Sequence, residues 1–212
     1  MERESYIDIV MCIDTTGSME YLIENVKEKS LSFCRDLSSH LEKEGKKLDK
    51  LRVKVISFKD SQFDKDFMLE SKFFTLDEEK EELYSFVKEL KAQGGGDRPE
   101  SSYEALALAM KSDWTRSKGG FGRHLIIMFT DAPPRPLEEG NVENAPKSYG
   151  ELYQLWDSLE RRKRRMYLCA PYDEHWSRLT EWESVVHVEC ADNMGCGEID
   201  MELCFRIISQ TL

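Results

Sequence analysis

The sequence has no long hydrophobic run and is short of positive charge, and each shortage excludes a class of protein. No apolar stretch approaches the roughly 20 residues that a membrane-spanning helix needs, and the charged start, MERESY, lacks the apolar segment of a signal peptide. Lys and Arg number 30 against 41 Asp and Glu, which gives a net charge of −11 and a pI near 5.0. This acidity argues against a nucleic-acid binder or a polybasic membrane binder. A bound cation remains open, because acids can cluster at one site.

The cysteines and histidines show no regular spacing. None of the six cysteines forms a C-x-x-C pair, and most lie among apolar neighbours. The histidines and cysteines lack the spacing of a zinc site. The three consecutive glycines from Gly94 to Gly96 are not followed by the G-K-[ST] of a phosphate-binding loop. We therefore expect reduced thiols in a cytoplasmic protein, with neither zinc nor a P-loop.

Strand-like and helix-like segments alternate along the 212 residues. Periodicity predicts strands at 6–14, 51–60, 68–76, 124–131, 165–171 and 184–190, and helices at 19–43, 77–90, 101–114, 150–165 and 198–208. No internal repeat or linker interrupts the pattern, so we expect a single domain over residues 1–212. The fold class predicted is α/β: a doubly wound, Rossmann-like sheet of six strands, mostly parallel with one antiparallel edge strand, and helices on both faces.

Three polar clusters lie where such a sheet binds ligands, beyond the carboxyl ends of its strands. DTTGSM (14–19) ends the first strand, FTDAPP (129–134) ends the most apolar one, and GGGDRPE (94–100) opens a helix. If those two strands are neighbours, Asp14 and Asp131 come within a few ångströms, and both stay charged only with positive charge between them. The hydroxyls of Thr16 and Ser18 and the carboxylate of Asp97 add further hard oxygen ligands. This set suits Mg²⁺, Mn²⁺ or Ca²⁺ rather than zinc.

Ser18 has a second interpretation. A serine at the start of a helix commonly caps the free backbone N–H groups, and Gly17 relieves crowding in a tight strand-to-helix turn. Alone, Ser18 fits a cap as well as a ligand. Together with Asp97 and Asp131, the metal interpretation is favoured.

The D-x-T-x-S of Asp14 to Ser18, the GGGD-x-PE of Gly94 to Glu100 and the FTDAPP of Phe129 to Pro134 together resemble the von Willebrand factor A (vWA) domain with its metal-ion-dependent adhesion site, MIDAS. The resemblance covers nearly the whole chain and looks closest to intracellular stand-alone vWA proteins, such as bacterial ones encoded near stress and tellurite-resistance modules. It implies a Mg²⁺ (or Mn²⁺ or Ca²⁺) ion held by Asp14, Thr16, Ser18, Asp97 and Asp131. Asp97 is a departure, because adhesion receptors commonly have Thr there.

The resemblance also implies a function. We expect a non-enzymatic, cytoplasmic adaptor in which the ion offers an open coordination position to an Asp or Glu of another protein, such as a component of a kinase–phosphatase or stress-response module, with no nucleic acid and no membrane as partner. The rim around the ion is expected to present Met19, Arg98, Glu100, Pro133 and Arg135. Both arginines could restore positive charge and bind the incoming carboxylate bidentately, although a solvated loop position is the favoured interpretation of each.

Two other functions stay open. The same carboxylates would serve a Mg²⁺-dependent phosphate-ester hydrolase, but its D-x-D-x-[TV] pattern needs an acid where Thr16 stands. A structural domain that has lost its metal site is the second. The basic run from Arg161 to Arg165 is interpreted as the end of a helix, where cations are favourable. The acidic turn with Asp60, Asp64 and Asp66 is interpreted as a solvated hairpin, since it lacks the glycine and glutamate of a calcium loop.

Overall fold

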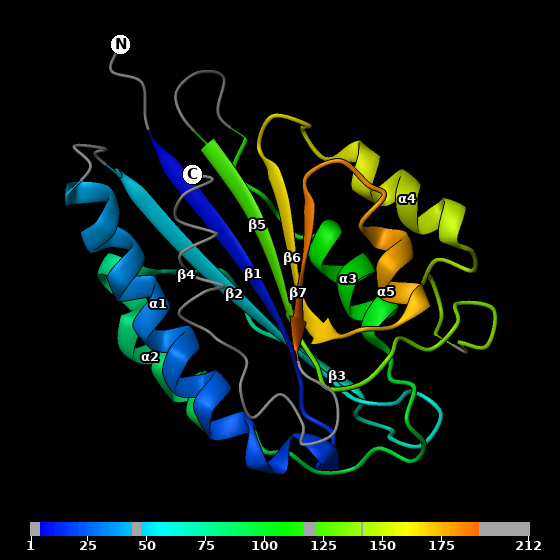
Figure 1. The fold of residues 1–212 in the computed structure, drawn as a ribbon. Helices are drawn as coiled ribbons and strands as arrows, with labels where there is room; N and C mark the ends of the chain where they lie inside the picture. The colour runs from blue at the N-terminus through cyan, green and yellow to red at the C-terminus, as the bar shows by residue number, and fades with distance from the viewer. Residues whose placement is uncertain (1–4, 44–47, 117–121, 141, 191–212) are drawn as a thin grey trace.

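The structure is a computed structural model, and it describes residues 5–43, 48–116, 122–140 and 142–190 (Figure 1). The helix expected at 198–208 lies outside the described residues. No described helix is both long enough and apolar enough to cross a membrane.

The strands form one sheet in the order β3-β2-β1-β5-β6-β7, with β4 also paired to β2. The strands are β1 (Tyr6–Asp14), β2 (Lys50–Phe58), β3 (Met68–Glu70), β4 (Phe74–Thr75), β5 (Gly122–Phe129), β6 (Arg164–Pro171) and β7 (Val185–Cys190). Pairing is parallel from β2 through β7, whereas β3 and β4 run antiparallel to β2. The predicted α/β class, with a mostly parallel sheet and an antiparallel edge, is confirmed.

The seventh strand arises because the edge segment is interrupted at Ser71. Its backbone N–H still donates to the carbonyl of Val55, at 2.9 Å. Its hydroxyl, however, accepts from the N–H of Val55 at 2.9 Å and donates to the carbonyl of Lys72 at 2.8 Å. A side chain thus takes a place that a backbone carbonyl holds in a regular ladder. The single strand predicted at 68–76 is therefore two short ones, β3 and β4.

Helices cover both faces of the sheet (Figure 1). They are the 3₁₀ helix η1 (Gly17–Tyr21), α1 (Ile23–Lys43), α2 (Leu76–Glu89), α3 (Ser102–Met110), α4 (Tyr149–Ser158) and α5 (Glu174–Leu179). Side chains of β1 alternate between two apolar clusters: Ile9 and Met11 pack with residues of α1 and α2, and Val10 and Cys12 with residues of α3, α4 and α5. Because both faces are covered, every residue of β1 is buried. The sequence did not predict the six-residue α5, which Asp173 caps by accepting from the N–H of His175.

The parallel register brings the carboxyl ends of the central strands to one edge of the sheet, the lower edge in Figure 1. Asp14, the last residue of β1, pairs with Phe58 at the end of β2, and Ile13 pairs with Phe129 at the end of β5. The loops that follow these strands therefore lie side by side. This edge holds the polar clusters that the sequence singled out.

Asp8 is the acid in the middle of the buried strand β1, and the guanidinium group of Arg52 compensates its charge there. Its carboxylate accepts from Nε and Nη2 of Arg52 at 2.8 and 2.6 Å and from the N–H of Thr115 at 2.6 Å. Removing one partner of a buried ion pair is far more costly than the pair is worth, because the remaining group stays desolvated. Asp8 is thus a structural acid, unconnected with the polar edge.

We expect Asp8→Ala to lower the free energy of unfolding by about 3 kcal/mol, measured by urea denaturation. The matched control is Glu183→Ala, which breaks an ion pair with Arg161 in which both side chains are exposed. The control should cost no more than about 0.5 kcal/mol. Equal losses in the two variants would contradict the structural role of Asp8.

Candidate functional site

Asp14 is the buried centre of the site. Its Oδ1 accepts from the backbone N–H of Thr16 at 2.9 Å and from the Thr16 hydroxyl at 2.6 Å. Its Oδ2 accepts from the hydroxyl of Thr130 at 2.6 Å. Burial nevertheless raises the pKa of Asp14 to about 6, against the opposing effect of these hydrogen bonds and with a further contribution from the charge of Asp131. The carboxyl group is held in place but poorly compensated as an anion.

Ser18 and Asp131 extend this network to the surface. The hydroxyl of Ser18 donates to Oδ1 of Asp131 at 2.9 Å and lies 3.2 Å from the hydroxyl of Thr16. A continuous row of oxygens therefore runs from Asp14 through Thr16 and Ser18 to Asp131. Thr16, rather than Ser18, holds the N-cap position of η1. The structure thus brings four of the five predicted ligands together, with Ser18 directed to Asp131 instead of capping a helix.

Sequence reasoning missed Thr130. This buried residue fixes one oxygen of Asp14 and also accepts from the N–H of Ala132 at 3.1 Å. The available signal was its position, a hydroxyl at the end of an apolar strand directly before Asp131. Thr130 orients the central carboxylate from the neighbouring strand.

The glycine-rich loop touches the first cluster directly. Gly94 and Gly95 both have φ near +81°, a region that other residues rarely adopt. The N–H of Gly17 donates to the carbonyl of Gly94 at 3.0 Å, and a Cβ on Gly95 would lie 3.2 Å from Cβ of Thr16. Glycine therefore lets the third loop approach the end of β1.

Glu100 faces this cluster from the third loop. It is 3% exposed, and its Oε1 lies beside Gly95, close to Thr16. Burial, followed by the charges of Asp14, Asp60 and Asp131, raises the pKa of Glu100 to about 9. Among the described residues, Oε2 has no hydrogen-bond partner. The expectation that Glu100 forms part of an exposed rim is wrong, because the backbone of the loop turns its side chain inward.

Asp97 lies in a separate cluster around Arg135. Nη2 of Arg135 donates to Asp97, to Oδ2 of Asp60 at 2.6 Å and to the carbonyl of Pro99 at 2.8 Å. The hydrogen bond from Arg135 holds the pKa of Asp97 below its usual range. The structure therefore ties Asp97 to Arg135 and does not place it in the row from Asp14 to Asp131. Asp60 is fully buried here, so the interpretation of its turn as solvated is wrong for this residue.

The remaining residues predicted for the rim differ in their exposure. Arg135 is buried and occupied by its acids, so it does not present a free guanidinium to a partner. Met19, a residue of η1, is buried in the core, which contradicts its predicted place in the rim. Arg98 is exposed, and its role in a partner-binding rim stays a prediction. Pro133 is partly buried, and its carbonyl accepts from the N–H of Glu100 at 3.1 Å, which links the second and third loops.

The donor set fits a hard divalent cation. No group of three or more His, Cys, Asp or Glu side chains within the described ranges is placed to hold a metal, so a site here must use hydroxyls. A hydroxyl has one proton and two lone pairs, and Thr16 and Ser18 direct their protons to carboxylates. Their lone pairs remain for a cation. Two carboxylates and two hydroxyls are ligands that Mg²⁺ accepts.

We expect Arg135→Met to lower the free energy of unfolding by about 3–5 kcal/mol, because Asp60 would stay buried without its cation. Adding Asp60→Asn to this variant should recover part of the loss, since the uncompensated charge is removed. Urea denaturation of the two single variants and the double variant measures the coupling. Strictly additive losses would contradict the pairing.

The pKa of Glu100 generates a pH prediction. In EDTA, the folded protein favours the neutral carboxyl group, so the stability that it contributes is full below its ordinary pKa of 4.5 and falls as pH rises toward about 9. The loss from this group is at most about 1.4 kcal/mol per pH unit. Glu100→Gln should therefore flatten the fall between pH 5 and 8, leaving the contributions of Asp14 and Glu104, whose pKa is also raised by burial. Urea unfolding of the parent protein and of Glu100→Gln at three pH values measures how the free energy of unfolding changes with pH. The same change in both proteins would contradict a raised pKa at Glu100.

Comparisons with known proteins identify the family and the fold. Residues 8–145, about two thirds of the chain, match the family model described as von Willebrand factor A domain. No curated protein sequence matches the chain. Among solved structures, the von Willebrand factor type A protein from Catenulispora acidiphila is similar, with a TM-score of 0.59, 12% identity, and coverage of 97% of this chain and 42% of that one.

Two further structures share the fold. The pilus adhesin SpaC from Lactobacillus rhamnosus GG has a TM-score of 0.58 and 13% identity, over 98% of this chain and 31% of that one. Proximal thread matrix protein 1 from the mussel byssus has a TM-score of 0.55 and 13% identity, over 99% of this chain and 49% of that one. The chain thus spans less than half the length of each. By its sheet and by the family match over residues 8–145, it belongs to the von Willebrand factor A domain family.

Proposed function

We propose that the protein is a metal-dependent protein-binding module in which a divalent cation, Mg²⁺ before Mn²⁺ or Ca²⁺, links it to an acidic residue of a partner. The observation that carries this proposal is the row of oxygens from Asp14 through Thr16 and Ser18 to Asp131. The two hydroxyl protons are already directed to carboxylates. The ligand geometry is therefore set before any ion arrives, which lowers the free-energy cost of binding one.

Glu100, rather than Asp97, supplies the acid of the third loop in this proposal. Its carboxyl group is buried toward Asp14 and Asp131, and one of its oxygens lacks a partner in the described part of the chain. Asp97 is neutralised by Arg135 instead. Burial and then repulsion from neighbouring acids raise the pKa of Glu100, and a cation beside Asp14 would oppose both effects by favouring the charged carboxylate.

An ion at this position would be reached from the side of Ser18 and Asp131. Asp14 and Thr16 are buried, Ser18 is exposed and Asp131 is half-buried. The open coordination position therefore faces solvent, where an Asp or Glu of a partner supplies the last oxygen. The chain's part is to hold, orient and partly dehydrate the cation, and no covalent chemistry is required of it.

This reading makes the protein an adaptor and not an enzyme. The names of two similar structures, a pilus adhesin and a thread matrix protein, fit a binding role. A cytoplasmic location, a partner from a kinase–phosphatase or stress-response module, and the MIDAS assignment itself remain predictions from the sequence.

We expect Mg²⁺ to raise the melting temperature of the protein relative to EDTA. At a free concentration of 100 times the Kd, the stabilisation should be about 2.7 kcal/mol. Asp14→Asn should abolish the shift and Glu100→Gln should weaken Mg²⁺ affinity at least about tenfold, because each removes negative charge at the ion. Differential scanning fluorimetry and isothermal titration calorimetry measure the two effects.

Asp97→Asn is the matched control, since it removes the neighbouring acid of the same loop. This variant should keep its Mg²⁺ affinity within about threefold. A larger loss in Asp97→Asn than in Glu100→Gln would show that the third-loop acid is Asp97, and no shift in the parent protein would refute the metal site.

A further inference from the structure

We infer that the partner docks on three exposed aromatic side chains around the candidate metal site, and that it does so with a loop carrying one acidic residue flanked by apolar ones. The inference rests on the proposed function, because the acidic residue is the one that would complete the ion. We name Tyr21, Phe63 and Tyr172 the aromatic rim. Large apolar side chains are usually buried, so exposed ones gathered at one place mark an interaction surface.

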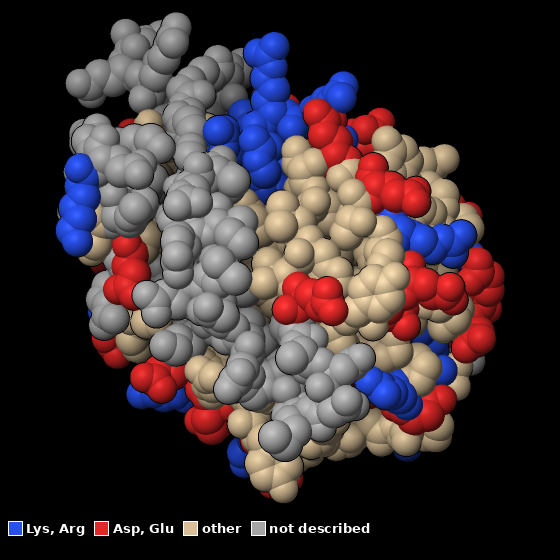
Figure 2. Space-filling model, viewed as in Figure 1, with Lys and Arg blue, Asp and Glu red and all other residues tan. Residues whose placement is uncertain are grey.

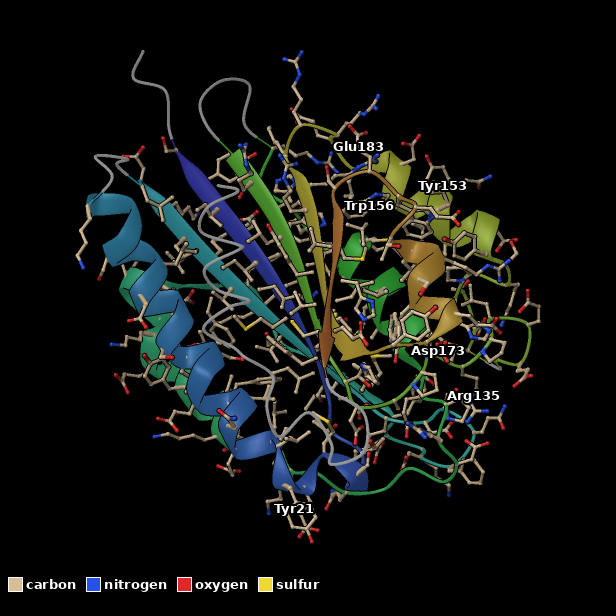
Figure 3. The ribbon with its side chains drawn as sticks, in the orientation of Figure 1. Tyr21, Arg135, Tyr153, Trp156, Asp173 and Glu183 are labelled. Atoms are coloured by element: carbon tan, nitrogen blue, oxygen red, sulfur yellow. The ribbon has the colours of Figure 1, made fainter. Side chains whose placement is uncertain are left out.

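Tyr21 is the most exposed of the three, at 92%. It ends η1, the short helix that begins directly after Thr16 and contains Ser18. Met19, within this helix, and Leu22, directly after it, are buried in the core and fix the helix there, while Tyr21 stays exposed. Figure 3 shows the ring directed outward at the edge of the molecule that holds the strand ends.

Phe63 is 58% exposed and rests on the third loop. A Cβ on Gly96 would lie 2.2 Å from Cγ of Phe63, so the ring occupies the space that any other residue at Gly96 would need. Asp64 secures the same contact, because its Oδ2 accepts from the N–H of Gly95 at 2.7 Å. The ring is therefore held over the glycine-rich loop with one face open to solvent.

Tyr172 is 64% exposed and follows the last residue of β6. The next residue, Asp173, caps α5 by accepting from the N–H of His175 at 2.8 Å, which fixes the bend. Tyr172 therefore stands at the end of its strand, on a backbone with little freedom. A side chain held in this way loses little entropy when a partner covers it.

The three aromatic residues lie in segments along the edge of the sheet that holds the candidate metal site. Phe63 follows β2, Tyr21 follows β1 and Tyr172 follows β6. The carboxyl ends of these strands lie at one edge of the sheet, and β5, which Asp131 follows, lies between β1 and β6. Neighbouring strands are about 4.8 Å apart, so the four strands span about 15 Å. One protein loop covers that width. Of the two other exposed large apolar side chains in the described part of the chain, Leu69 lies on the edge strand β3, and Tyr153 lies on α4, well away from the strand ends (Figure 3).

Charge determines what flanks the acidic residue of the partner. In the proposed site the carboxylates of Asp14, Asp131 and Glu100 together at least balance the two positive charges of the ion, and the protein as a whole carries −11. Figure 2 shows acidic side chains scattered over the face that it draws, with basic ones among them. Additional acids on a partner would be repelled, so a single acid with neutral, apolar neighbours complements this edge. Aromatic residues are the side chains that contribute most to such contacts.

The test uses a phage-displayed library of disulfide-closed peptides with one fixed central Glu and three random residues on each side, selected on the full chain in Mg²⁺. Apolar residues should be enriched beside the Glu. A synthetic peptide of the selected sequence should bind in Mg²⁺ and not in EDTA.

The variants of the aromatic rim test which side chains contact this peptide. Tyr21→Ala, Phe63→Ala and Tyr172→Ala should each weaken peptide binding by about tenfold, whereas the control Tyr153→Ala should change the affinity less than twofold. Phe63→Leu, which keeps an apolar contact with Gly96, should bind better than Phe63→Ala.

Calorimetry with Mg²⁺ alone separates the two proposals. If the rim variants bind Mg²⁺ and peptide as Tyr153→Ala does, or if the enriched flanks are polar, the aromatic rim is overturned and the metal-dependent function stands. If peptides bind equally in EDTA and to Asp14→Asn, the proposed function fails and the docking surface fails with it.

Discussion

The rest of the edge depends on one constraint, the burial of the Asp14 carboxylate at the end of the central strand. An ionised carboxylate removed from water is unfavourable by several kcal/mol unless other groups compensate for the lost hydration. Thr16 supplies a backbone N–H and a hydroxyl, and Thr130 supplies a hydroxyl from β5. These donors are neutral, so they orient the carboxylate without cancelling its charge. The raised pKa of Asp14 expresses this remaining cost.

Two other buried aspartates in the described part of the chain differ from Asp14 because each has an arginine beside it. Asp8 has Arg52, and Asp60 has Arg135, each at 2.6 Å. The recorded partners of Asp14 are hydroxyls and a backbone N–H, with no arginine or lysine among them in the described part of the chain. Of these three buried aspartates, two therefore lie beside an arginine, and Asp14 has neutral donors instead. This contrast is the physical reason to assign a cation to Asp14 rather than to Asp60 and Asp97.

The sequence predicted the parts of the site that strand direction determines. Parallel strands end at one edge, so Asp14, Thr16, Ser18 and Asp131 had to meet once β1 and β5 were neighbours. It did not predict how individual loop side chains turn. Asp97 and Glu100 are three residues apart, and the choice between them is made by Arg135, which binds Asp97 and leaves Glu100 facing inward. Likewise the short β4 and α5 depend on single local hydrogen bonds, at Ser71 and Asp173, that hydrophobic periodicity does not report.

The charge balance at the proposed ion also affects how a partner would be selected. An ion whose charge is balanced by its own ligands orients an incoming carboxylate at short range but attracts it weakly at a distance, and the net charge of −11 opposes acidic proteins generally. Selectivity must then come from groups that discriminate shape, and these are the exposed rings fixed by the turns after β1, β2 and β6. The turns after β1 and β2 are anchored to the glycine-rich loop through Gly17 and Asp64, so that loop holds both the ring of Phe63 and the carboxyl group of Glu100. A cation that drew Glu100 toward Asp14 would therefore act on the same loop that supports the contact surface.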